Sequence, residues 1–323
     1  SFIRWAVEQG HTVFVISWVN PDERHARLNW EDYIREGIVL ALDTIEKATG
    51  EREVNAIGYC VGGTLLAAAL AMFAREGETR IASATLFTTQ VDFTHAGDLK
   101  VFVDNDQIQA VEDSMKDKGY LDGSKMATAF NMLRSGDLIW PYVVSNYMKG
   151  KEPMPFDLLY WNSDSTRMTA ANHSYYLRNC YLENNLANDR MWLGGAPVHM
   201  RDVKVPIYNL AAREDHIAPA RSVFEGCKHF GGEVTYVMGG SGHIAGVINP
   251  PDKVKYQFWT NGKPQGDFDA WVENATVTPG SWWPHWQVWI EAMDATRVKP
   301  RKPGGGKLKP IEDAPGSYVK VRV

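Results

Sequence analysis

The feature that most constrains the fold is the run VNAIGYCVGGTLLAAAL, which begins at Val54. Its first six residues have the pattern of a buried strand, and residues 61–76 have that of a helix rich in small side chains. Cys60 lies between the two. The backbone of such a sharp turn is strained, and we expect Gly58 and Gly62 to relieve the crowding. The turn should therefore expose the thiol at the carboxyl edge of a sheet.

The predicted helix after Cys60 directs its N-terminus toward the sulfur. Its dipole and its free N–H groups favour a thiolate and any oxyanion formed nearby. The backbone N–H of Val61 is therefore a candidate oxyanion-hole donor. The alternative is a buried structural cysteine in a tight turn. The succession of strand, G-x-C-x-G-G and small-residue helix favours a nucleophile.

Strands and helices alternate on both sides of this turn. The patterns predict helices over 2–9, 30–49 and 61–76 and strands over 11–18, 54–59 and 81–88. After an interruption, strands are predicted over 205–211 and 233–238, and helices over 219–230 and 283–293. This alternation is typical of a mostly parallel sheet with helices on both faces, which places the chain in the α/β class.

The interruption, residues 93–198, is rich in Met, Tyr and Trp and shows amphipathic helical patterns such as 126–149. We expect it to form a cap inserted between two strands of the sheet. The predicted organisation is a first part of the core over 1–92, the cap over 93–198, a second part of the core over 199–296 and a tail over 297–323. The Pro- and Gly-rich basic tail has the composition of a solvated linker.

The overall composition argues against several classes of protein. The net charge is −5, whereas nucleic-acid binding usually requires a strongly basic face. No apolar run approaches the ~18 residues that a membrane-spanning helix needs, and no signal peptide is recognisable. Three cysteines without paired spacing make neither a disulfide framework nor a zinc site, so we expect a reducing, cytoplasmic setting and no metal.

A thiol nucleophile needs a base, and the base needs a group that orients it. In folds with this type of turn the chain order is nucleophile, acid, histidine, with the last two on loops after later strands. The strand at 205–211 is followed by Asp215, and the strand at 233–238 is followed by His243. We therefore expect Asp215 to orient His243 and His243 to accept the proton of Cys60.

Other residues could take these roles. His216 is a rival base or a substrate contact, although its position beside Asp215 should turn it away from the pair. Glu214 is a rival acid, disfavoured because a short Asp is the more usual orienting group. Cys180 and Cys227 have no strand-turn-helix context, so we expect them to be packed and chemically inert.

A cysteine in this position favours some reactions over others. Serine would form an oxyester intermediate, whereas cysteine forms a thioester that stays reactive toward a weak alcohol nucleophile. This suits an enzyme that receives an acyl group from one thioester and passes it to an acceptor, and a thiol hydrolase could use water as that acceptor.

Several segments together resemble the catalytic domain of class I polyhydroxyalkanoate synthases. They are GYCVGGTLL, SWVNPDE, REDHIAP, SGHIAGVINPP, FDLLYWNSD and SWWPHW, and the likeness extends over nearly the whole chain. The resemblance implies an α/β-hydrolase fold with a cap and a triad of Cys60, His243 and Asp215. It also implies polymerisation of (R)-3-hydroxyacyl-CoA, with 3-hydroxybutyryl-CoA and similar short units as substrates and with release of coenzyme A.

The resemblance also implies partners and a location. They are the acyl-CoA substrate, the growing polyester chain, a second subunit in a homodimer and the surface of a polymer granule in the cytoplasm. No cofactor is implied, because acyl-CoA is a substrate. Trp161 in the cap, Ile244 beside His243, and His216 are the candidate substrate contacts. An alternative for Trp161 is a core aromatic residue of the cap.

One departure from the family pattern affects these expectations. Family members carry an N-terminal domain and the first strands of the sheet, which we expect this chain to lack, together with the loop that supplies the second oxyanion donor. Two other functions stay open: a thiol-dependent esterase or polyester depolymerase, and a non-catalytic granule-surface scaffold. The intact set of Cys60, Asp215 and His243 argues against the scaffold.

Overall fold

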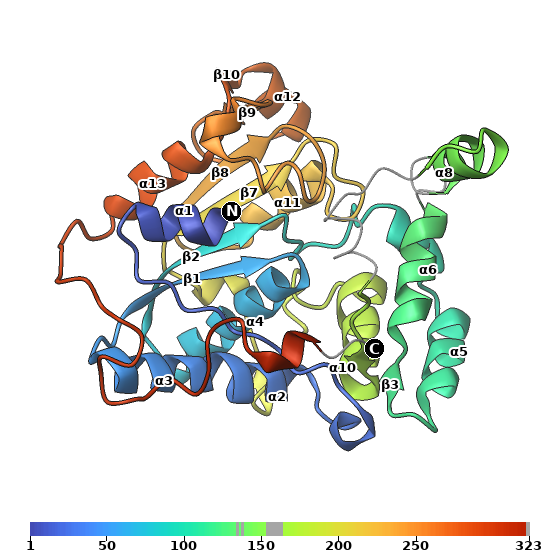
Figure 1. The fold of residues 1–323 in the computed structure, drawn as a ribbon, viewed down its shortest axis with the longest axis horizontal. Helices are drawn as coiled ribbons and strands as arrows, with labels where there is room; N and C mark the ends of the chain where they lie inside the picture. The colour runs from blue at the N-terminus through green and yellow to red at the C-terminus, as the bar shows by residue number, and fades with distance from the viewer. Residues whose placement is uncertain (134–135, 137–138, 153–163, 321–323) are drawn as a thin grey trace. The chain divides into compact units, whose positions relative to one another are not determined.

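The computed structural model describes residues 1–133, 136, 139–152 and 164–320 (Figure 1). The chain divides into two compact units. Unit 1 comprises Ser1–Ile16, Glu31–Lys100 and Arg178–Pro310, and unit 2 comprises Ser17–Trp30, Val101–Leu177 and Ile311–Val323. The predicted cap boundaries at 93 and 198 stay predictions.

Unit 1 contains a six-stranded sheet in the order β1-β2-β7-β8-β9-β10. Four strands run parallel, namely β1 (Val54–Tyr59), β2 (Ile81–Phe87), β7 (Ile207–Ala212) and β8 (Val234–Gly239). Two antiparallel strands, β9 (Gln257–Thr260) and β10 (Thr276–Pro279), complete it. The predicted class, a mostly parallel α/β sheet, is confirmed, while the two antiparallel strands were not predicted.

One face of this sheet is covered by α4 (Val61–Glu76) and α11 (Ala220–Cys227). Gly58, Leu86 and Asn209 are neighbours in the strand register, so they point to the same face. Gly58 packs against the start of α4, and the Asn209 amide donates a hydrogen bond to the sulfur of Cys227 in α11 at 3.3 Å. Both helices therefore cover this face.

The opposite face carries the main aromatic core, beneath α1 (Phe2–Glu8) and α13 (Trp283–Glu291). Tyr208 and Leu210, which alternate with Asn209 along β7, pack there with Trp282, Trp283 and other buried side chains. Phe2 of α1 contacts Trp283 edge-to-face at a ring-centroid distance of 5.1 Å. Both faces of the sheet are thus covered by helices, as the sequence predicts, and Figure 1 shows α1 beside α13.

The remaining elements of unit 1 are short, apart from one long helical segment. Residues 31–49 continue from α2 (Trp30–Asp32) through a π-helical segment (Tyr33–Val39) into α3 (Leu40–Thr49), which ends at Gly50 with φ 80°. The predicted helix over 30–49 is therefore confirmed. Between the main strands lie β5 (Trp192–Leu193), β6 (Ala196–Pro197) and α12 (Phe268–Glu273), with 3₁₀ turns at Asp98–Phe102, Met200–Asp202 and Pro251–Lys253.

Unit 2 is mostly helical. It contains α5 (Asn105–Met115), β3 (Tyr120–Leu121), α6 (Gly123–Leu133), α8 (Trp140–Tyr142), a π-helical segment (Val143–Met148), β4 (Met168–Thr169) and α10 (Ala170–Tyr176). Strands β3 and β4 pair antiparallel. Trp30 is buried and stacks on Tyr175 and Tyr176 of α10. The predicted helix over 126–149 corresponds to helical segments on either side of residues 134–138, which are described only at 136.

The prediction of a strand over residues 11–18 was wrong. These residues form no regular element, and Phe14, Val15 and Ile16 expose 48%, 63% and 42% of their surface. An apolar β-branched run becomes a strand only where a neighbouring strand completes its ladder. In the described part of the chain β1 pairs only with β2, and residues 11–18 pair with neither.

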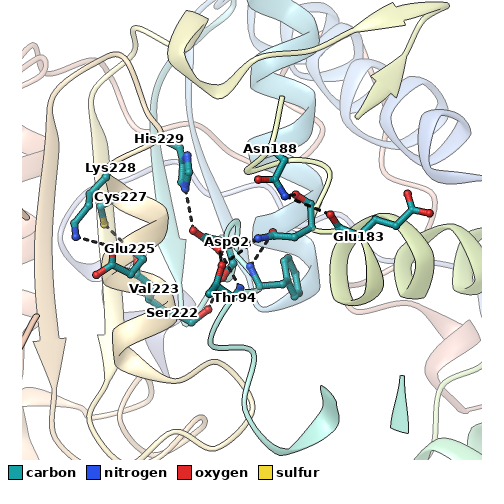
Figure 2. A network of polar contacts seen from close by, with 12 residues as sticks. Asp92, Thr94, Glu183, Asn188, Ser222, Val223, Glu225, Cys227, Lys228 and His229 are labelled. Atoms are coloured by element: carbon teal, nitrogen blue, oxygen red, sulfur yellow. Dashed lines mark hydrogen bonds and ion pairs between the residues drawn. The ribbon is translucent and has the colours of Figure 1, made fainter. Parts of the chain in front are cut away.

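A polar network fixes the chain where it leaves β2 (Figure 2). The Asp92 carboxylate accepts hydrogen bonds from the backbone and hydroxyl of Thr94, at 2.9 and 2.7 Å, and from the Asn184 amide at 2.9 Å. It also contacts the His229 imidazole at 3.0 Å, while the Ser222 hydroxyl donates to the Asp92 carbonyl at 2.5 Å. Asp92 therefore joins three segments that are distant in the sequence.

We expect Asp92→Asn to lower the free energy of unfolding at pH 7 by about 2 kcal/mol, because it weakens several charge-assisted hydrogen bonds. Although burial opposes ionisation, the hydrogen bonds from His229, Thr94 and Asn184 hold the pKa of Asp92 below its usual range. A depressed folded pKa stabilises the fold above the unfolded pKa of ~3.9 and less as the pH falls below it. Urea unfolding at pH 7 and pH 3 should therefore show a smaller difference between variant and parent at pH 3.

The control for this measurement is Asp252→Asn, because the Asp252 side chain is 70% exposed. This variant should unfold like the parent at both pH values. Equal stability of Asp92→Asn and the parent at pH 7 would show that the network around Asp92 contributes nothing.

Candidate active site

The structure places Cys60 at a strained turn between β1 and α4. Its backbone has φ 54° and ψ −125°, which side-chain-bearing residues rarely adopt. The Cys60 N–H donates to the Phe87 carbonyl at 2.9 Å, which fixes the turn against the end of β2. Cys60 is partly exposed, whereas Cys180 and Cys227 are 0% and 3% exposed. Cys60 is therefore the accessible thiol of the chain.

Of the two glycines predicted to relieve crowding around Cys60, the structure supports this role for Gly58 and not for Gly62. A Cβ on Gly58 would lie 2.5 Å from the Cα of Gly63, and one on Gly63 would lie 1.8 Å from the Thr89 hydroxyl oxygen. A Cβ on Gly62 would meet nothing within 4 Å. The prediction that Gly62 relieves crowding was therefore wrong. The close packing of α4 against β1 and the segment after β2 requires Gly58 and Gly63.

We expect Gly63→Ala to lower the free energy of unfolding by about 2–3 kcal/mol, because α4 must move away from Thr89 to admit the methyl group. Since the Thr89 hydroxyl also donates to the Cys60 carbonyl at 3.4 Å, the turn should shift as well. Gly62→Ala is the matched control, with the same change one residue away in open space. Urea unfolding of the two variants checks the difference, and equal stabilities would contradict it.

Asp215 and His243 meet on the loops that follow β7 and β8. The His243 Nδ1 lies 2.6 Å from one carboxylate oxygen of Asp215. The other oxygen accepts the backbone N–H groups of Ile217 and Ala218 at 2.8 and 2.9 Å. The Asp215 side chain is fully buried and that of His243 is 10% exposed. The carboxylate is therefore held in place by the backbone and directed at one nitrogen of the imidazole.

The electrostatics join His243 to Cys60 as well as to Asp215. Burial alone would lower the pKa of His243, but hydrogen bonds with Asp215 and with Cys60 outweigh it and raise the pKa. The imidazole therefore lies near the Cys60 thiol as well as against the Asp215 carboxylate. A raised pKa means that the buried imidazole favours its protonated form, with the Asp215 carboxylate as its counter-ion.

The loop that carries His243 is held by two tryptophans whose role the sequence did not indicate. The indole N–H of Trp282 donates to the Gly246 carbonyl at 3.0 Å, and that of Trp283 donates to the Val247 carbonyl at 2.9 Å. Both rings are 1% exposed. The SWWPHW motif therefore fixes the loop that carries His243 to the start of α13. The pair of adjacent tryptophans could have indicated this role, because buried indole N–H groups need hydrogen-bond acceptors.

The other predicted site residues have varied positions. Val61 is the first residue of α4, so its N–H belongs to the first turn, where a helix offers unpaired donors. Ile244 and His216 are half-buried beside His243 and Asp215. Glu214 is exposed, and Asp215 takes the contact with His243. Trp161 lies outside the described residues.

Two cavities of about 240 and 380 Å³ lie around Lys263 and Gln265. The first is lined by Val234, which begins β8, whereas His243 follows the end of that strand. This first cavity therefore lies at the opposite edge of the sheet from the candidate triad.

Within the described ranges, no three His, Cys, Asp or Glu side chains gather as a metal site would require, and no helix has the length and apolar character to span a membrane.

The fold and the arrangement of Cys60, His243 and Asp215 define a class of protein. A family model for the alpha/beta hydrolase fold matches residues 3–250, and the chain belongs to this family. In this fold the nucleophile follows a strand at a sharp turn, and the acid and the histidine follow later strands. Cys60, Asp215 and His243 follow β1, β7 and β8 in that order.

Within this fold the chain is similar to curated poly(3-hydroxyalkanoate) polymerases. It is 70% identical over 322 residues to "Poly(3-hydroxyalkanoate) polymerase subunit PhaC" of Rhizobium meliloti, covering 100% of this chain and 52% of that protein. The corresponding protein of Rhizobium etli is 67% identical, covering 100% and 51%, and the "Poly(3-hydroxyalkanoate) polymerase" of Methylorubrum extorquens is 61% identical, covering 100% and 53%. The predicted resemblance is confirmed, and the chain spans about half the length of these relatives.

Proposed function

We propose that this chain is the catalytic part of a polyhydroxyalkanoate synthase, an acyltransferase that polymerises (R)-3-hydroxyacyl-CoA and releases coenzyme A. The observation that carries the proposal is a strained, partly exposed cysteine near a histidine that is hydrogen-bonded to a buried aspartate. The similarity to polymerases over the whole chain supports acyl transfer over hydrolysis, because the triad geometry alone serves both reactions.

In the first step the Cys60 thiolate attacks the carbonyl carbon of the acyl-CoA thioester. The developing oxyanion accepts the Val61 N–H at the start of α4, where the helix dipole stabilises it. Collapse of the tetrahedral intermediate breaks the bond to the sulfur of coenzyme A, which leaves with the proton held by His243. The product is an acyl-thioester on Cys60, and Asp215 keeps the imidazole oriented throughout.

In the second step the 3-hydroxyl group of another unit attacks the thioester on Cys60. His243 is now neutral and accepts the hydroxyl proton as a general base, which Asp215 supports by stabilising the imidazolium that forms. The ester bond lengthens the polymer by one unit and the Cys60 thiolate is regenerated. Each cycle therefore consumes one thioester and needs no cofactor.

The remaining features of the proposal follow from the family. Short 3-hydroxyacyl units such as 3-hydroxybutyryl are the proposed substrates, although one methylene is worth only ~1–3 kcal/mol of discrimination in a pocket. Residues 93–198 are the proposed cap that excludes water from the thioester. A homodimer at the surface of a cytoplasmic polymer granule is the proposed assembly.

The test uses a protein that carries these residues, with 3-hydroxybutyryl-CoA as the substrate. Thiol release is followed continuously, and the acyl product of the same sample is sized by chromatography. The proposal expects thiol release coupled to a high-mass polyester. Release with free 3-hydroxybutyrate as the only product would assign the chain to the thiol hydrolases, and thiol release in a Cys60→Ala control would refute the mechanism.

A further inference from the structure

Tyr59, the last residue of β1, contacts the candidate base in two ways. Its ring stacks on the His243 imidazole, with a centroid distance of 5.4 Å and an interplanar angle of 22°. Its hydroxyl donates a hydrogen bond to the backbone carbonyl of His243 at 2.7 Å. One residue thus touches both the side chain and the main chain of His243 and directly precedes Cys60 in the sequence.

These contacts complete the support of the histidine loop. Trp282 and Trp283 hold the loop downstream of His243, at Gly246 and Val247, and Asp215 holds one imidazole nitrogen. These three residues do not fix the main chain at His243 itself or the tilt of the imidazole plane. Tyr59 does both, and because it is covalently joined to Cys60, any displacement of the nucleophile moves this support with it.

The Tyr59 hydroxyl keeps its proton under the conditions in which such an enzyme works. Burial raises the pKa of this phenol, and the nearby charges of Cys60 and Asp215 raise it further. A protonated hydroxyl can donate to the His243 carbonyl throughout the neutral range.

We propose that Tyr59 is a positioning residue, which holds the His243 imidazole toward the Cys60 sulfur through its ring and its hydroxyl. The proposal rests on the proposed function in so far as His243 is the base of that reaction. Tyr59 itself forms no bond with the substrate and transfers no proton. It sets the geometry in which a protonated His243 can stabilise a thiolate at Cys60.

The test measures the rate of Cys60 alkylation by iodoacetamide in the 323-residue chain as a function of pH. The reaction reports on Cys60, because Cys180 and Cys227 are buried. A thiolate paired with an imidazolium reacts at pH values where a free thiol is protonated. Tyr59→Phe loses the hydrogen bond and keeps the ring, whereas Tyr59→Leu loses both.

We expect the alkylation profile to move to higher pH in both variants, with a rate at pH 6.5 that falls about 3- to 10-fold in Tyr59→Phe, as expected for one lost hydrogen bond. The fall should be larger in Tyr59→Leu, so that phenylalanine partly restores the profile. Tyr256→Phe is the matched control, since this tyrosine is 44% exposed and Tyr59 is 36% exposed. Its profile should match that of the parent.

A purely structural role would change the melting temperature and leave the pH profile in place. Parent-like profiles in both Tyr59 variants, with near-ultraviolet circular dichroism showing the native fold, would therefore overturn the proposal. A shift in the leucine variant alone would support it and assign the effect to the ring. Because alkylation needs no acyl-CoA, a parent protein that makes no polymer would refute the proposed function and leave this test intact.

Discussion

Cys60→Ala should abolish acyl transfer, lowering kcat by about 10⁴-fold or more, as expected when a covalent nucleophile is removed. Neither of the other two cysteines can replace it, because Cys180 and Cys227 are buried. Thiol release from 3-hydroxybutyryl-CoA should therefore fall to the uncatalysed rate. The fold should persist, since alanine removes only the sulfur of a partly exposed side chain. Turnover within tenfold of the parent would exclude Cys60 as the nucleophile.

Two further variants sharpen this result. Cys180→Ala makes the same chemical change at a buried cysteine, so it should lower stability and leave the turnover of folded protein near that of the parent. Cys60→Ser keeps a nucleophile of similar shape but forms an oxyester, which is a weaker acyl donor. If Cys60→Ser releases coenzyme A once and then stalls without polymer, the thioester is needed for chain growth.

Asp215→Asn should lower kcat by about 10⁴-fold, by analogy with other catalytic triads. The carboxylate accepts two backbone N–H groups and faces His243, so an amide in its place presents a donor or leaves the imidazole in the wrong tautomer. It also removes the charge that stabilises the imidazolium. Steady-state thiol release with saturating substrate measures the effect on kcat.

The control for this variant is Glu214→Gln, the same change at the neighbouring exposed carboxylate. It should leave kcat within about twofold of the parent value, as surface changes usually do. A large loss of kcat in Glu214→Gln, together with a small loss in Asp215→Asn, would show that Glu214 and not Asp215 orients the histidine.

The sequence was sufficient to predict the elements that depend on local patterns. The strand Val54–Tyr59 and the helix Val61–Glu76 have the predicted bounds, because their patterns are long and each is confined by glycine or a charged segment. The positions of Asp215 and His243 just after β7 and β8 also followed from local patterns. Their contact could be expected because parallel strands bring their carboxyl ends to one edge.

What could not be predicted depends on contacts between distant segments. Gly62 and Gly63 are indistinguishable in sequence, and only the position of Thr89 decides which one is indispensable. The run at 11–18 has the composition of a strand but no partner in the described chain. The antiparallel strands β9 and β10 are four residues each, too short for a clear pattern.

The pair of tryptophans that fixes the histidine loop has a consequence for the order in which the protein matures. Trp282 and Trp283 lie 36 residues after the carbonyl groups that they hold, beyond β9 and β10. A growing chain on the ribosome therefore contains Cys60, Asp215 and His243 before it contains the donors that fix the histidine loop. The proposed acyl-transfer activity should therefore appear only after α13 has been synthesised and has packed on the sheet. Until then, while nearly all of this chain is being synthesised, the activity should be absent.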